Sequence, residues 1–223
     1  MGEISLQSAD GFSFSAYEAK PRGESRGAVV VIQEVFGVNS HIRSVADGYA
    51  AEGFYTVAPA LFDRVESGVE LGYGEADIQR GADLAFNRLQ MEQTLADIQA
   101  AIDHAAGAGR VGMVGYCFGG LLTWLSACRL GNLAAASSYY GGGVPDQRAM
   151  TPRCPIILHF GEQDDYIPME SVRQFMARHP GLQVYTYDAD HGFNCEQRAS
   201  YDPAAADLAR QRTLELFSRH LGA

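Results

Sequence analysis

The sequence has few cysteines, and none of them has a spacing typical of metal binding or disulfide exchange. The four are Cys117, Cys128, Cys154 and Cys195. They form no Cys-x-x-Cys pair and no cluster with histidine of the kind that holds zinc. We therefore expect no metal site, and free thiols of the kind found in a reducing cytoplasm.

The chain also lacks an excess of positive charge and any long apolar run. Its 17 basic residues stand against 27 acidic ones, a net charge of −10, which argues against nucleic acid or an anionic membrane as the partner. No run of about 18 apolar residues could span a bilayer, and residues 1–7 lack the basic and apolar regions of a secretory signal. We expect a cytoplasmic monomer or weak dimer whose partner is a small molecule.

What is present is an alternation of strand and helix patterns after an opening hairpin. Residues 5–18 alternate around the turn signal Asp10-Gly11. The expected strands then cover residues 28–32, 55–59, 111–115, 134–140, 155–160 and 183–187, and the expected helices 41–52, 73–106 (with or without a break), 121–130, 169–178 and 203–221. This order predicts one α/β domain over residues 1–223, with a mostly parallel sheet covered on both faces. In such sheets, functional residues gather at the carboxyl ends of the strands.

A cysteine follows one of these strands, at the centre of the pentapeptide Gly115-Tyr116-Cys117-Phe118-Gly119. The strand–turn–helix order predicts a nucleophile elbow, with a thiol where serine is usual. The small residues at 115 and 119 suit a tight turn with a closely packed helix. The start of the helix favours the thiolate, and the N–H of Phe118 can face a developing oxyanion.

An activated cysteine needs a base and a carboxylate that orients the base. Asp164 follows the strand at 155–160, and His191 follows the strand at 183–187. The order Cys117, Asp164, His191 is the nucleophile–acid–base order of α/β hydrolases. Asp165 is expected in solvent, and His159, inside a strand, is expected to be buried and structural. The remaining histidines, His41, His104, His179 and His220, carry no pattern.

A fourth candidate, Glu34, follows the first parallel strand in the segment 33–39. With an elbow next to it, its carboxylate is expected to approach the Cys117 thiol. The backbone N–H of Val35 then becomes the second expected oxyanion donor, beside that of Phe118.

Several motifs in order give the chain a resemblance to the dienelactone hydrolase (carboxymethylenebutenolidase) family. They are Gln33-Glu34-Val35-Phe36-Gly37-Val38-Asn39, Val114-Gly115-Tyr116-Cys117-Phe118-Gly119-Gly120, Tyr139-Tyr140-Gly141, Gly161-Glu162-Gln163-Asp164 and His191-Gly192-Phe193. The resemblance implies an α/β-hydrolase fold without a large cap, a Cys-His-Asp triad that needs no cofactor, and opening of a dienelactone to maleylacetate. It also implies that Glu34 holds the resting cysteine as a protected thiol until substrate arrives.

The chain departs from the family where arginines would bind the substrate carboxylate. Arg80 stands near one such position, but Cys195 occupies the other, with Arg198 three residues further on. Phe36 and Tyr140, within two of the shared motifs, are further candidate substrate contacts. Cys195 itself is expected to be packed rather than reactive.

This departure leaves the substrate open between a small lactone and a different ester. A carboxylesterase or thioesterase on the same machinery is one alternative. A non-catalytic redox-sensing or ligand-binding protein, with Cys117 as a regulated thiol, is the other.

Overall fold

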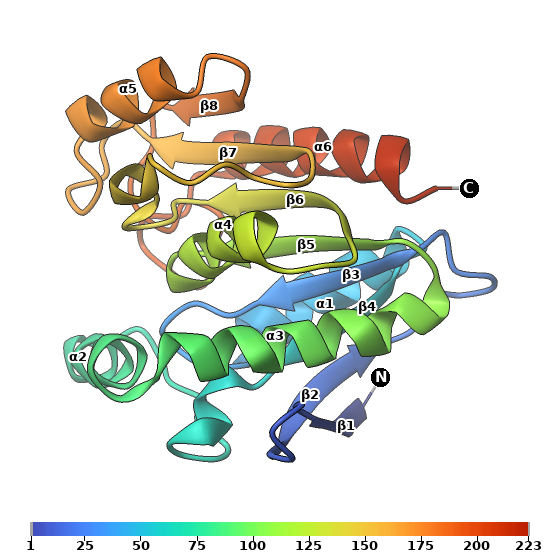
Figure 1. The fold of residues 1–223 in the computed structure, drawn as a ribbon. Helices are drawn as coiled ribbons and strands as arrows, with labels where there is room; N and C mark the ends of the chain where they lie inside the picture. Colours follow the sequence, from blue (N-terminus) through green and yellow to red (C-terminus); the bar gives the residue numbers. More distant parts are fainter. Residues whose placement is uncertain (1, 223) are drawn as a thin grey trace.

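A single eight-stranded sheet runs through the structure, a computed structural model that describes residues 2–222 (Figure 1). Its strands lie in the order β1-β2-β4-β3-β5-β6-β7-β8. In chain order they are β1 (Gly2–Gln7), β2 (Ser13–Ala19), β3 (Ala28–Ile32), β4 (Tyr55–Pro59), β5 (Val111–Tyr116), β6 (Leu133–Tyr139), β7 (Ile156–Gly161) and β8 (Gln183–Tyr187). The six strands from β3 to β8 are parallel, as the alternating pattern predicted.

The helices cover both faces of this sheet. They are α1 (Ser40–Ala51), α2 (Glu75–Ala82), α3 (Met91–Ala105), α4 (Phe118–Arg129), α5 (Met169–Arg178) and α6 (Pro203–His220). Figure 1 shows α3, α4 and α5 on one face, and α1 and α6 on the other. The central strand β3 is buried along its whole length because it is covered from both sides, which explains its unbroken β-branched and alanine sequence.

The opening hairpin forms an antiparallel edge of the same sheet. Leu6 pairs with Phe14 across β1 and β2, and β2 continues the sheet by pairing antiparallel with β4. The predicted hairpin is thus confirmed, although its strands reach beyond the expected limits of residues 5 and 18. Only its inward-facing side chains are buried, so only half of its residues carry the hydrophobic pattern.

The helical pattern predicted over residues 73–106 contains a break. Helix α2 continues into a π-helical turn over Asp83–Arg88, residues 89 and 90 are extended, and α3 then begins at Met91. A π-helical turn is uncommon and shifts the side chains around the helix axis, and such turns are often found at functional sites. Here it lies beside the carboxyl ends of the strands (Figure 1).

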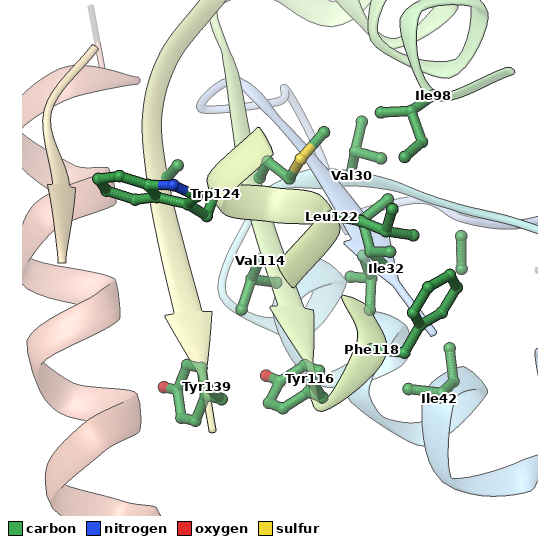
Figure 2. Close-up of a cluster of buried hydrophobic side chains, with 14 of the residues drawn as sticks. Val30, Ile32, Ile42, Ile98, Val114, Tyr116, Phe118, Leu122, Trp124 and Tyr139 are labelled. Atoms are coloured by element: carbon green, nitrogen blue, oxygen red, sulfur yellow. The ribbon is translucent and has the colours of Figure 1, made fainter. Parts of the chain in front are cut away.

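Helix α4 lies at the centre of the core. Figure 2 shows Leu122 and Trp124 of this helix within a cluster of buried side chains that includes Ile32 of β3 and Val114 of β5. Trp124 also meets Phe175 of α5 edge to face, with ring centroids 5.1 Å apart. Because α4 is buried on nearly all sides, it fixes the position of the turn that precedes it.

The architecture is that of an α/β hydrolase, and no cap domain is inserted within residues 2–222. No helix in that range has the length and apolar character needed to cross a membrane.

Candidate active site

Cys117 stands alone between β5 and α4, in a backbone conformation that side chains rarely adopt. Its φ is 54° and its ψ −116°, and its N–H donates to the carbonyl of Tyr139 at 3.0 Å. A Cβ at Gly115 would lie 2.1 Å from the carbonyl oxygen of Gly119, and one at Gly119 would lie 2.4 Å from that of Ile32. Only glycine fits at either position, so the pentapeptide forms the sharp turn that its pattern predicted.

The structure brings the predicted nucleophile, Cys117, together with its predicted base, His191, and the predicted carboxylate, Asp164. Nε2 of His191 lies 3.1 Å from Sγ of Cys117, and its Nδ1 lies 2.7 Å from Oδ2 of Asp164. The other oxygen of Asp164 accepts the backbone N–H groups of Tyr166 and Ile167, at 2.8 and 3.2 Å. The Asp164 side chain is fully buried, whereas Asp165 is exposed, as predicted.

The charges around His191 favour its protonated form. Burial lowers the pKa of His191, but the Cys117 thiolate and the Asp164 carboxylate, which both bond to the ring, outweigh burial and raise this pKa well above its usual value. A protonated imidazole next to the Cys117 sulfur can deliver its proton to a leaving group.

The competing histidine, His159, is a buried structural residue, as predicted. Its Nδ1 lies 2.7 Å from the hydroxyl of Tyr187, and its ring packs on Tyr139 with centroids 4.4 Å apart. Burial, and then the charge of Arg212, lower the pKa of His159 to about 3, so the ring is neutral and separate from the thiol chemistry.

Val35 and Phe118, the two predicted oxyanion donors, lie beside Cys117. Phe118 is the first residue of α4, so its N–H has no acceptor within the helix. Val35 is held from the other side, because Gly81 of α2 packs so closely that a Cβ there would lie 2.0 Å from the Val35 carbonyl oxygen. Both residues line the same cavity as the thiol.

Glu34 is fully buried, but its predicted contact with the thiol is not formed. Neither of its carboxylate oxygens has a hydrogen-bond partner among the described residues. The Cys117 thiol is engaged by His191 instead. The role of Glu34 in holding a protected thiol stays a prediction.

A cavity of about 170 Å³ opens in front of Cys117 and His191. Apart from these two residues, its lining is predominantly apolar: Val35, Phe36, Ile78, Ala82, Phe86, Phe118, Gly142 and Tyr166, with Arg198 as its one cation. The sequence pattern identified Phe36 but missed Ile78, Phe86 and Tyr166. The only available signal was their place in segments next to strand ends, which many surface residues share.

The two remaining predicted substrate contacts, Arg80 and Tyr140, do not line this cavity. Arg80 is exposed on α2 and forms an ion pair with Glu66, because the helix turns it away from the thiol. Tyr140 is fully buried behind His191, with ring centroids 5.1 Å apart, and so supports the imidazole. Arg198, three residues after Cys195, lines the cavity instead, with its guanidinium against Gly192, next to His191.

Glu34 also belongs to a second group of polar side chains, which the sequence analysis did not predict. His41, from the start of α1, and Cys195 place donor atoms within 4.8 Å of each other and of the Glu34 carboxylate. All three side chains are buried, so the prediction of a packed Cys195 is confirmed. These are the residues that could hold a metal ion.

Comparison with known proteins agrees with the fold and with the motifs. Residues 14–221 match the model of the dienelactone hydrolase family. A carboxymethylenebutenolidase of Pseudomonas putida is 33% identical over 225 residues, which cover 96% of this chain and 95% of the relative. A protein of Synechocystis sp. assigned as a carboxymethylenebutenolidase is 37% identical over 213 residues, 86% of each chain.

Solved structures extend the likeness to the backbone. A crystal structure from Klebsiella pneumoniae, assigned as a dienelactone hydrolase, superimposes with a TM-score of 0.84 at 28% identity, over 99% of this chain and all of the other. A dienelactone hydrolase-like promiscuous phosphotriesterase from metagenomic libraries shares the fold, with a TM-score of 0.75 at 20% identity over 99% of both chains. The chain belongs to the dienelactone hydrolase family and is a carboxylic-ester hydrolase with the α/β-hydrolase fold.

Proposed function

We propose that the protein hydrolyses a small lactone or ester through a thioester formed on Cys117. The observation that carries this proposal is the line of contacts from Sγ of Cys117 through His191 to Asp164, at 3.1 and 2.7 Å, at the inner end of an apolar cavity. Nucleophile, base and orienting carboxylate are the parts that covalent acyl transfer needs.

In the first half-reaction, the Cys117 thiolate attacks the carbonyl carbon and forms a carbon–sulfur bond. The carbonyl electron pair moves to the oxygen, which the N–H groups of Val35 and Phe118 stabilise. When the tetrahedral intermediate collapses, the ester carbon–oxygen bond breaks and the leaving oxygen takes the proton from Nε2 of His191. With a lactone, that oxygen stays attached to the acyl group as a hydroxyl.

In the second half-reaction, His191 is neutral and acts as a base. It takes a proton from water while the water oxygen attacks the thioester carbon. The carbon–sulfur bond then breaks, the free acid leaves, and the thiolate–imidazolium pair is restored. Asp164 keeps Nδ1 of His191 protonated throughout, so that Nε2 faces the reacting atoms.

The cavity favours a substrate with a small apolar acyl part and at most one negative charge. Apolar side chains dominate its wall, and Arg198 has no ion-pair partner among the described residues. One guanidinium beside the histidine suits one carboxylate on the substrate. A dienelactone, which carries a single carboxylate, fits this description, and so does a neutral ester of similar size.

The test is hydrolysis of dienelactone and of p-nitrophenyl acetate by the Cys117→Ala variant. We expect turnover to fall to the background rate on both substrates. Cys154→Ala is the matched control, because Cys154 lies outside the cavity and should be replaceable without loss. Unchanged turnover in Cys117→Ala would overturn the proposal.

A carboxylesterase or thioesterase is the second candidate, favoured by the apolar wall. A panel of dienelactones, uncharged esters and acyl thioesters separates the two by kcat/KM. Alkylation of Cys117 by iodoacetamide, without hydrolysis of any member of the panel, would indicate a thiol sensor instead.

A further inference from the structure

Three buried side chains that belong to three different segments converge behind the thiol. Glu34 follows β3, His41 lies in the first turn of α1, and Cys195 lies in the segment after His191. One donor atom from each falls within 4.8 Å of the other two. Each of the three side chains is fully buried.

Two of these three side chains have polar atoms without a partner, whereas the Cys195 sulfur contacts the Tyr73 hydroxyl. Both carboxylate oxygens of Glu34 and Nε2 of His41 have no hydrogen-bond partner among residues 2–222. Leaving a buried polar atom unpartnered costs about 1–3 kcal/mol, and more for a charged group. Unpartnered atoms on two buried side chains, with a buried thiol next to them, indicate a ligand that binds all three side chains.

The other ring nitrogen of His41 is already held in place. Its Nδ1 lies 3.0 Å from Oε2 of Glu196, at the surface. Because a carboxylate only accepts, Nδ1 carries the hydrogen in the neutral ring, and the buried Nε2 keeps a free lone pair. A carboxylate that orients histidine in this way is the usual support of a metal-bound imidazole.

The donor set also fits a divalent cation by charge and by type. One thiolate and one carboxylate together neutralise a charge of +2, and neutral imidazole completes the set. Cysteine, histidine and glutamate are all ligands of zinc, with bonds of about 2.0–2.3 Å. Zinc would draw the donors in from their present limit of 4.8 Å by at most about 1.5 Å.

We propose that Glu34, His41 and Cys195 form a binding site for Zn²⁺ or a similar divalent transition-metal ion. On binding, Cys195 gives up its proton to the solvent and the metal takes the sulfur lone pair. A water molecule can take the fourth position. The ion joins the Val35 segment to the segment that carries His191, and so acts as a clamp between the two loops of the active site.

The first test is titration of the full-length protein with Co²⁺, after treatment with EDTA and desalting. We expect one equivalent to bind, with a thiolate-to-cobalt charge-transfer band in the near ultraviolet. The band should disappear in Cys195→Ser and in His41→Gln, and persist in the matched controls Cys154→Ser and His104→Gln. It should also persist in Cys117→Ser, which removes the other thiol near Glu34.

Absence of a band in the wild-type protein would overturn the proposal. So would a band that survives in Cys195→Ser, or one that is lost only in Cys117→Ser, which would place the metal on the nucleophile. Circular dichroism shows whether each variant is folded. If the ligand variants do not fold, X-ray absorption of zinc-loaded Cys117→Ser protein decides, by the presence or absence of one sulfur at about 2.3 Å.

The second test is thermal unfolding, which is independent of activity. At a zinc concentration about 100 times its Kd, Tm should rise by about 5 °C in the wild-type protein. The same zinc should leave Tm of Cys195→Ser unchanged. An equal rise in both proteins would mean that zinc binds elsewhere and would refute the clamp.

Discussion

The ring of Phe86 meets the ring of Phe118 edge to face, with centroids 5.4 Å apart. Phe118 is buried at the start of α4, whereas Phe86 is 60% exposed in the π-helical turn that follows α2. This contact places the exposed ring of Phe86 in the wall of the cavity, against Phe118, the residue that follows Cys117. The π-helical turn therefore contributes to the wall of the cavity in front of Cys117.

Phe86→Ala should selectively weaken the binding of substrates with larger apolar acyl groups. Butyrate has two more methylenes than acetate, and each is worth about 0.8 kcal/mol when buried, so we expect kcat/KM for p-nitrophenyl butyrate to fall by up to about tenfold, mostly through KM. The smaller acetate should lose less. Steady-state kinetics on both esters measures the difference, with the exposed Leu208→Ala on α6 as control. Equal losses on both esters would argue against a binding role.

Asp164→Asn should lower kcat by about 10³-fold with little change in KM. The amide can no longer fix the hydrogen on Nδ1 of His191, so the ring loses the tautomer that turns a lone pair or a proton toward Cys117. The adjacent Asp165→Asn is the matched control, since Asp165 is exposed. A comparable loss in both variants would contradict the assignment of Asp164.

Glu34→Gln tests whether this carboxylate holds the thiol in a protected form. Glu34 does not contact Cys117 in the structure, whereas His191 does. We therefore expect the rate of iodoacetamide alkylation of Cys117 to stay within about threefold of wild type. His191→Gln should reduce the same rate at least tenfold, because the imidazolium stabilises the thiolate. A tenfold rise in Glu34→Gln would instead support gating by Glu34.

The fold and the three central residues of the site were predictable because their causes are local. A buried β-branched run such as residues 28–32 has few alternatives to a central strand. A Cβ at Gly115 or Gly119 would lie 2.1 or 2.4 Å from a backbone oxygen, so the turn requires glycine at both positions. Such a requirement produces a recognisable sequence motif. Asp164 and His191 each follow a strand, and parallel strands end at one edge of the sheet.

The residues that the sequence did not reveal are brought together by long-range packing. His41 lies in an ordinary helical pattern, and only the docking of α1 against the segment after His191 buries it beside Cys195. Phe86 reaches the cavity only because the helix after Ala82 changes to a π-helical turn. Arg80, expected as a substrate contact, lies outside the cavity for a related reason, because the rotation of α2 directs its side chain to Glu66.

Arg198→Gln should impair substrates that carry a carboxylate and spare neutral ones. Arg198 is the one arginine among the described residues that line the cavity, so we expect KM for dienelactone to rise about tenfold while KM for p-nitrophenyl acetate stays constant. Arg80→Gln is the control, because its exposed ion pair with Glu66 contributes little. If Arg80→Gln raised KM for dienelactone and Arg198→Gln did not, the assignment of the two arginines would be reversed.

His159 should make the protein sensitive to acid. Burial, and then the charge of Arg212, lower its pKa in the folded protein to about 3, against about 6.5 in the unfolded chain. Above pH 6.5 the ring is neutral in both states and has no effect on the pH dependence. Between pH 6.5 and 3 only the unfolded chain binds the proton, so the free energy of unfolding falls as pH falls.

The expected slope from this one group is up to about 1.4 kcal/mol per pH unit. Urea unfolding at several pH values between 4 and 8 measures it, within the range where the protein refolds. His159→Gln should lower stability at pH 7.5, because it disturbs the hydrogen bond to Tyr187, yet it should flatten the slope below pH 6.5. The exposed His104→Gln should leave the slope as it is. An unchanged slope in His159→Gln would show that other buried groups cause the loss of stability in acid.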